Sequence, residues 1–131
     1  MTSFHQWNIG AMAWTVVYTD EFGTWFAQLS GHQQIDVRAV IGLLEEEGPR
    51  LPFPYSSGIE GSRHGHMREL RIQSGGRALR VFYAFDPRRT AVLLIGGVKG
   101  GDKRFYLRTI IRADRLYDAH LKSLRKGSPK R

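Results

Sequence analysis

The chain has 131 residues, of which 41% are hydrophobic, and it carries a formal net charge of +8 at pH 7. A chain of this length is expected to form a single domain with a modest core. It contains no cysteine, which excludes disulfides, thiolate metal sites and cysteine nucleophiles. The N-terminus lacks the pattern of an export signal, and no apolar stretch is long enough to cross a bilayer. We therefore expect a soluble protein of the cytoplasm.

The basic residues are distributed unevenly along the chain. Residues 67–131 hold 17 basic and 5 acidic side chains, a net charge of +12, whereas residues 1–66 hold 3 and 7, a net charge of −4. This asymmetry indicates that the second half binds a polyanion, most simply nucleic acid. The alternative is a basic surface that only keeps the protein soluble.

The first half predicts one strand followed by two helices. Residues 14–19 (WTVVYT) are aromatic and β-branched, as is typical of a strand. Thr19 and the two acids after it form a helix N-cap and an acidic first turn, and Gly31 is expected to end that helix. A second helix is predicted over residues 33–47, before the Gly-Pro pair at residues 48–49.

The second half predicts three strands and a final helix. A loop rich in Gly, Pro and Ser covers residues 48–66. Residues 67–73 and 79–85 alternate apolar and polar side chains, and residues 90–95 are apolar enough for a strand that is buried on both faces. The last helix is expected over residues 105–124.

The order β-α-α-β-β-β-α predicts an α+β fold. We expect a small antiparallel or mixed sheet with two N-terminal helices packed on one face and a C-terminal helix. The other face is left open to carry Arg71 and Arg80, which the hairpin brings close together. The whole chain forms one domain, whose core spans about residues 14–124, with flexible ends at 1–11 and 127–131. Translation could begin at Met1 or at Met12.

Residues 93–106 (LLIGGVKGGDKRFY) contain the glycines of a phosphate-binding loop but not its other residues. Gly96 and Gly101 have the spacing of a nucleotide-binding loop, yet Asp102 stands where a lysine is needed, and no hydroxyl residue follows Lys103. A carboxylate at that position would repel the phosphates. We interpret the stretch as a strand end, a glycine hinge and a helix start that collect positive charge.

The second half of the chain resembles a known family. The stretch RELRIQSGGRALRVFYAF (residues 68–85), followed by an apolar strand, Lys99 and ADRLYDAHL, resembles the phage-derived Gp49-like branch of the RelE/HigB/ParE toxins. The resemblance covers roughly residues 14–124. It implies a RelE-like fold and the role of toxin in a type II toxin–antitoxin module.

RelE- and HigB-like members of this superfamily are endoribonucleases that cleave messenger RNA, usually on the ribosome, and use no metal or other cofactor. The resemblance therefore implies attack of a ribose 2′-hydroxyl on the adjacent phosphate. That reaction needs a base, positive charge around the phosphate, and an acid for the leaving oxygen. Besides messenger RNA and the ribosome, the resemblance implies an antitoxin as partner, a small protein with a helix-turn-helix domain, and no membrane.

The same resemblance assigns residues to the site. Arg71 and Arg80 would clamp the scissile phosphate, since guanidinium groups bind phosphate in a bidentate manner. Lys99 would be a further phosphate ligand or the base, and Tyr106 the general acid or a base-stacking ring. The predicted catalytic residues are thus Arg71, Arg80, Lys99 and Tyr106. The further residues predicted to bind RNA are Arg68, Arg77, Lys103 and Arg104.

Two features of catalytic relatives are missing. Some HigB proteins have a catalytic histidine soon after the last strand, but residues 98–106 contain none. Some RelE proteins end in a catalytic tyrosine, but residues 129–131 are Pro-Lys-Arg. The match therefore does not fix the acid and the base. A ParE-like inhibitor that binds DNA gyrase, and a non-catalytic RNA-binding relative, are the alternatives. We interpret His64 and His66 as structural or solvent-facing rather than as metal ligands.

Overall fold

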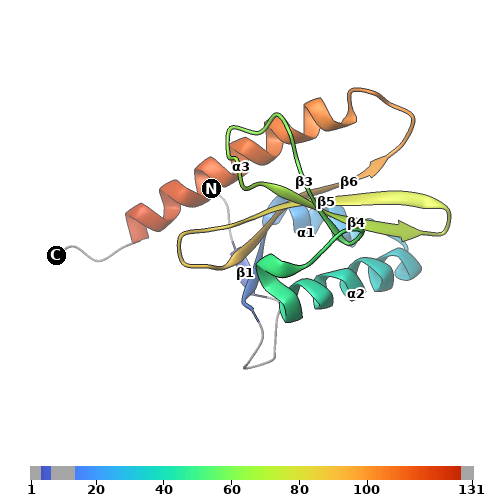
Figure 1. Cartoon of the computed structure of the whole chain (residues 1–131), viewed down its shortest axis with the longest axis horizontal. Helices are drawn as coiled ribbons and strands as arrows, with labels where there is room; N and C mark the ends of the chain where they lie inside the picture. Colours follow the sequence, from blue (N-terminus) through green and yellow to red (C-terminus); the bar gives the residue numbers. More distant parts are fainter. Residues whose placement is uncertain (1–3, 7–13, 128–131) are drawn as a thin grey trace.

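The computed structural model describes residues 4–6 and 14–127 and shows a six-stranded sheet with helices on both sides (Figure 1). The strand order is β1-β2-β6-β5-β4-β3, and neighbours are antiparallel except for the parallel pair β2 and β6. The strands are β1 (Phe4–Gln6), β2 (Val16–Thr19), β3 (Ser56–Gly58), β4 (Arg68–Ser74), β5 (Arg77–Phe85) and β6 (Ala91–Lys99). The helices are α1 (Asp20–Ala27), α2 (Gly31–Glu47), the 3₁₀ turn η1 (Gly48–Arg50) and α3 (Phe105–Gly127). The predicted α+β class is confirmed.

The sequence did not predict the two outermost strands. β1 lies among the N-terminal residues expected to be flexible, and it pairs with β2. β3 lies in the predicted loop and pairs with β4. Each of these strands has only three residues, too few to show the period-two alternation that identifies a strand. Met12 and the expected flexible C-terminal residues 128–131 lie outside the described residues.

Side-chain caps define the starts of the first two helices. Thr19 accepts a hydrogen bond from the Phe22 N–H at 3.0 Å, which caps α1 as the sequence predicts. Ser30 and Gln33 form a reciprocal capping box at the start of α2. Gly31 therefore begins α2 and does not end α1, because Ser30 satisfies the first N–H groups of the second helix.

Helices cover both faces of the sheet (Figure 1). α1 and α2 pack on one face, over a core that includes the fully buried Leu70 and Leu79. α3 packs on the other face, over Phe82, Ala84 and Leu94. The expectation that this second face stays open is therefore wrong where α3 crosses it. The β4–β5 hairpin extends beyond the first turn of α3 in Figure 1, so its end is not covered by that helix.

Polar contacts fix the orientation of α3. His120 Nε2 and Asp86 Oδ2 lie 2.8 Å apart, and both side chains are buried. The Tyr117 hydroxyl donates to the Phe85 carbonyl at 2.9 Å. Both contacts join the second half of α3 to the end of β5 and the turn after it. No helix among the described residues has the length and apolarity needed to span a membrane.

Two glycines in β6 allow aromatic rings to approach the strand. A Cβ at Gly96 would overlap the indole of Trp25 on the α1 side, and one at Gly97 would lie 2.8 Å from the Phe105 ring on the α3 side. These two glycines are therefore strand residues that permit close packing. The glycine hinge that the sequence predicts can therefore include only Gly100 and Gly101, which follow β6.

Gly96→Ala is expected to lower the free energy of unfolding by about 1–3 kcal/mol, because the added methyl group must displace the Trp25 indole or the strand. Gly100→Ala is the matched control, since a Cβ there has nothing within 4 Å in the described part of the chain. Denaturant unfolding of both variants measures the difference. Equal stability of the two variants would contradict this account of β6.

Candidate functional site

Arg71 and Arg80 lie side by side on the sheet face that α3 partly covers. They are direct partners in the register of β4 and β5, as the alternation of the two strands predicts. Arg80 is 6% exposed, and its Nη1 donates to the Leu79 carbonyl at 3.0 Å. Arg71 is half-buried, and its guanidinium carbon lies 5.2 Å from the centre of the Phe53 ring. The structure therefore places two guanidinium groups next to each other at the surface of the sheet.

The buried carboxylate of Glu69 joins the two arginines. Glu69 is 4% exposed and lies two residues before Arg71 on the same face of β4. Arg71 Nη1 donates to Glu69 Oε2 at 3.2 Å, and Arg80 Nε lies 3.6 Å from Oε1. Two guanidinium groups and one carboxylate leave the cluster positive, and the buried charges are paired. Sequence reasoning did not select Glu69 as a site residue, although its alternation with Arg71 is the signal that could have found it.

Tyr106 completes the cluster from the first turn of α3. Its hydroxyl donates to Glu69 Oε1 at 2.7 Å and accepts from Arg80 Nε at 3.3 Å. Its ring lies 5.9 Å from the ring of Phe82. Burial raises the pKa of Tyr106, and the hydrogen bond to Glu69 raises this pKa further, against a smaller lowering by Arg80. The hydroxyl is therefore protonated at neutral pH and is a proton donor.

Lys99 lies at the end of β6, exposed, on the same sheet face as the arginines. It is the register partner of Ala78, while Gly97 is the partner of Arg80. Lys99 is thus a diagonal neighbour of Arg80, and such neighbours are separated by about 7–8 Å, with their Cβ atoms somewhat closer. The Phe105 ring packs over Gly97, the register partner of Arg80 on this face, which lies two residues before Lys99.

The other predicted RNA-binding residues do not join this cluster. Arg68 shares a face of β4 with the core residues under α2, and its Nε donates to the Ser56 hydroxyl at 2.8 Å. Arg77 is exposed at the hairpin end of β5, opposite Ser74. Lys103 and Arg104 are exposed in the turn before α3. The structure therefore brings Arg71, Arg80 and Tyr106 together and places Arg68 elsewhere.

Asp102, the residue that stands where a nucleotide loop needs a lysine, stabilises the glycine-rich turn. Its carboxylate accepts the Arg104 N–H at 2.8 Å and pairs with Arg108 Nη1 at 2.7 Å. The backbone hydrogen bond from Arg104 lowers the pKa of Asp102, and the hydrogen bond from Arg108 lowers it further. Asp102 thus stays ionised and fixes the turn that leads into α3.

A pocket with a volume of about 460 Å³ opens beside the cluster. Arg71 and Arg80 line it on the side of the sheet, and Asp36 from α2 lines it on the opposite side. The Asp36 carboxylate accepts a hydrogen bond from the Ser74 hydroxyl at 2.6 Å, which joins α2 to the end of β4. The pocket gives a ligand access to the otherwise buried Arg80.

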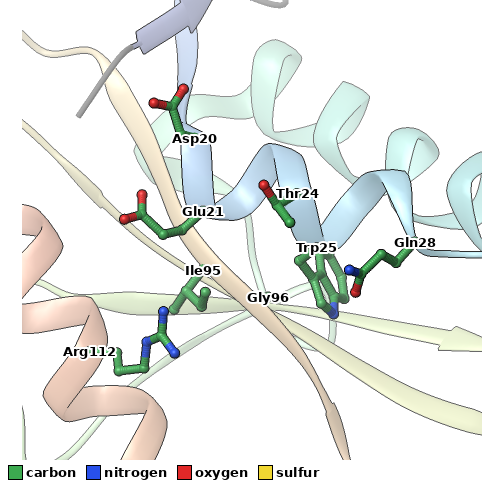
Figure 2. Close-up of a pocket in the computed structure, with 8 residues that line it drawn as sticks. All are labelled: Asp20, Glu21, Thr24, Trp25, Gln28, Ile95, Gly96 and Arg112. Carbon is green, nitrogen blue, oxygen red and sulfur yellow. The ribbon is translucent and has the colours of Figure 1, made fainter. Parts of the chain in front are cut away.

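A second pocket, of about 380 Å³, lies where α1, β6 and α3 meet (Figure 2). Figure 2 shows Asp20 and Glu21 from α1 on one side and Arg112 from α3 on the other, with Trp25 beside Gly96. Two carboxylates against one guanidinium make this pocket a poor site for phosphate. We therefore place the candidate site at the arginine pair.

The histidine pair makes structural contacts. His64 Nε2 lies 2.8 Å from Asp118 Oδ1, and His66 Nε2 lies 3.2 Å from the Tyr117 hydroxyl. Both histidines thus connect the loop before β4 to α3. Within residues 4–6 and 14–127, no group of three His, Asp or Glu side chains converges as a metal site would require.

The fold and the candidate site together define a small α+β protein with a mixed sheet that carries a pair of adjacent arginines. Residues 24–118 match the family described as "Phage derived protein Gp49-like (DUF891)", and the chain belongs to this family, within its HigB-like branch.

Two curated relatives come from Mycobacterium tuberculosis (strain ATCC 25618 / H37Rv). The chain is 37% identical to "Putative toxin HigB2" over 123 residues, which are 92% of this chain and 61% of that protein. It is 38% identical to "Putative toxin HigB3" over 109 residues, which are 82% of this chain and 94% of that protein. The chain thus spans less than two thirds of the first relative and nearly all of the second.

Proposed function

We propose that this protein is the toxin of a type II toxin–antitoxin system and a metal-independent endoribonuclease that cleaves messenger RNA in the cytoplasm. The relatives named as HigB toxins support the toxin role. The nuclease activity rests on one observation, the cluster in which Arg71 and Arg80 adjoin the Glu69 carboxylate and the Tyr106 hydroxyl. A protein that only binds DNA gyrase has no need for an acid, a base and two guanidinium groups in mutual contact.

The cluster supplies each part of an attack by a 2′-hydroxyl on the adjacent phosphate. Arg71 and Arg80 bind the non-bridging oxygens and stabilise the negative charge of the phosphorane. Glu69 takes the proton of the 2′-hydroxyl as that oxygen bonds to phosphorus. Tyr106 gives its proton to the 5′-oxygen as the phosphorus–oxygen bond breaks, and a 2′,3′-cyclic phosphate and a 5′-hydroxyl result. The hydrogen bond between Tyr106 and Glu69 then returns the proton from the base to the acid.

Other cations extend the site along the RNA. Lys99 binds the scissile phosphate or its neighbour from the end of β6, and Lys103 and Arg104 bind phosphates further along the strand from the turn before α3. Arg77 serves the same purpose at the hairpin end. The ribosome orients the messenger RNA in this cluster, because holding the 2′-hydroxyl in line with the 5′-oxygen lowers the barrier by removing orientational freedom.

The antitoxin in this proposal is a small helix-turn-helix protein that covers the basic cluster. Its acidic side chains would pair with the cations around Arg71, and this charge complementarity favours rapid association. Inhibition follows directly, because a phosphate cannot reach Arg80 when the pocket beside it is closed.

Tyr106→Phe is expected to slow cleavage by about a hundredfold, at the lower end of the contribution of a general acid, since water can replace the lost donor. The pKa of Tyr106 is raised above the ordinary tyrosine value of 10, so its hydroxyl stays protonated throughout the neutral and mildly alkaline range. The wild-type rate should therefore not fall between about pH 7 and 9 through loss of this proton. Initial rates of the wild type and the variant across that range test both statements. A variant with the full wild-type rate would exclude Tyr106 as the acid.

Induction in bacterial cells, followed by mapping of RNA 5′ ends, tests the proposed function. New 5′-hydroxyl ends within messenger RNAs are expected. Growth arrest with intact messenger RNA and relaxed plasmid DNA would instead indicate gyrase inhibition. Absence of toxicity with folded protein present would contradict both activities. Incubation of the purified protein with free RNA and with ribosome-bound messenger RNA then measures the dependence on the ribosome.

A further inference from the structure

The loop between η1 and β3 presents two aromatic rings to solvent beside the arginine pair. Phe53 is 68% exposed and Tyr55 is 43% exposed. The other large hydrophobic side chains exposed in the described part of the chain are aliphatic, and they lie on α2 and α3. They are Ile35, Leu107 and Ile111. Within residues 4–6 and 14–127, the large aromatic side chains that are exposed therefore lie together, next to the candidate site.

Backbone hydrogen bonds hold these rings in a fixed relation to Arg71. The Arg71 N–H donates to the Tyr55 carbonyl at 2.9 Å, which joins the loop to β4. The N–H groups of Tyr55 and Ser56 both donate to the Pro52 carbonyl, at 3.0 and 3.1 Å. The Arg71 guanidinium lies over the Phe53 ring at 5.2 Å. Because the loop is anchored to the strand, a ligand that binds Arg71 also meets the two rings.

The charges that line the adjoining pocket favour different positions for the phosphate and for the base of a nucleotide. Arg71 and Arg80 provide positive charge on the side of the sheet, and Asp36 provides negative charge on the side of α2. A phosphate is attracted to the first side and repelled by the second. A nucleobase has no charge and carries amino groups that can donate to a carboxylate such as that of Asp36. Tyr55 lines the same pocket as Arg71, Arg80 and Asp36.

We propose that Phe53 and Tyr55 form a stacking subsite for an unpaired nucleobase adjacent to the phosphate held by Arg71 and Arg80. Aromatic rings beside a cationic track are the means by which proteins bind single-stranded RNA, since each base has a face that can stack. A base inside a duplex has both faces covered by its neighbours, so the subsite selects single-stranded RNA. This inference rests on the proposed function, because it takes the phosphate at the arginines to be part of an RNA strand.

Binding of oligonucleotides that cannot be cleaved tests the subsite apart from catalysis. The probe is a fluorescently labelled 2′-O-methyl RNA of about eight nucleotides, within the range of single-strand sites. Phe53→Ala is expected to raise Kd at least fivefold, and Phe53→Trp to restore it, because Trp also stacks. The salt dependence of Kd should stay unchanged, because no charge is removed. Ile35→Ala, at a side chain that is 69% exposed on α2, is the control for loss of an exposed apolar group.

A second probe, an abasic strand of the same length, isolates the contribution of the bases. The wild type and Phe53→Ala should bind this strand equally. If Phe53→Ala and Tyr55→Ala both leave the affinity for the base-containing probe unchanged while Arg80→Ala abolishes binding, the subsite is refuted and the proposed function stands. If Arg80→Ala also binds the probe as tightly as the wild type, both the subsite and the proposed function are refuted. Loss of the antitoxin complex alone in Phe53→Ala would assign the rings to a protein interface and overturn the proposal.

Discussion

Arg80→Ala is expected to lower the rate of RNA cleavage by about 100- to 1,000-fold. Arg80 is the guanidinium in contact with both Glu69 and Tyr106, so its removal withdraws positive charge from the place where the phosphorane forms. Its Nη1 is fixed by the Leu79 carbonyl, and little reorganisation is needed when negative charge develops. Single-turnover cleavage of a labelled RNA by the purified variant measures the loss.

Arg80→Lys separates the charge of Arg80 from its geometry. Lysine keeps the positive charge but cannot form two parallel hydrogen bonds to a phosphate, so we expect a rate between those of the wild type and Arg80→Ala. Arg88→Ala is the matched control, because it removes one exposed arginine from the turn after β5. Thermal unfolding checks that each variant is folded. A folded Arg80→Ala variant that cleaves at the wild-type rate would contradict the proposed site.

The arginine pair could be predicted from the sequence because a strand has a strict period of two. A short turn between two alternating strands fixes their register, and the register fixes which residues face each other. The same rule also shows why Arg68 lies elsewhere. It is an odd number of residues from Arg71, so its side chain points to the face of Leu70, under α2.

The position of α3 and the role of the β6 glycines could not be predicted in this way. An amphipathic helix shows which of its own faces is buried, but not which face of the sheet it covers. Gly96 and Gly97 suggest a hinge in the sequence, since glycine is the usual residue of turns. Their role depends on the rings of Trp25, which comes from a helix far away in the chain, and Phe105, which begins the next helix and reaches Gly97 only because that helix folds back on the sheet. Tertiary contacts of this kind are not encoded in local periodicity.

Glu69 was missed for a related reason. A carboxylate beside two arginines in an alternating strand has the pattern of an ordinary surface ion pair. Such a pair contributes little to the free energy of folding. In the structure its side chain is buried and accepts a hydrogen bond from Tyr106, a residue 37 positions later in the chain. Only the packing of α3 on β5 and β6 brings that hydroxyl to the carboxylate, and this contact turns an ion pair into a candidate acid–base pair.

Glu69→Gln is expected to lower the cleavage rate by about a thousandfold, because the amide keeps the shape of the side chain but cannot take a proton from the 2′-hydroxyl. The free energy of unfolding should fall by about 2–3 kcal/mol, since the buried Arg80 loses its counter-charge. RNA affinity should stay equal or increase, because the cluster becomes more positive. A purely structural role would weaken binding and cleavage together.

The decisive test of Glu69 therefore compares the effect of its substitution on RNA binding with the effect on the cleavage rate. Kd for a 2′-O-methyl RNA and the single-turnover rate for the cleavable strand are compared at a temperature where Glu69→Gln is folded. Glu69→Asp, which keeps the carboxylate one methylene further back, should recover part of the rate but not all of it. If Glu69→Gln cleaves as fast as the wild type, the base lies elsewhere. Lys99 is then the candidate, and Lys99→Met should abolish the activity that Glu69→Gln retains.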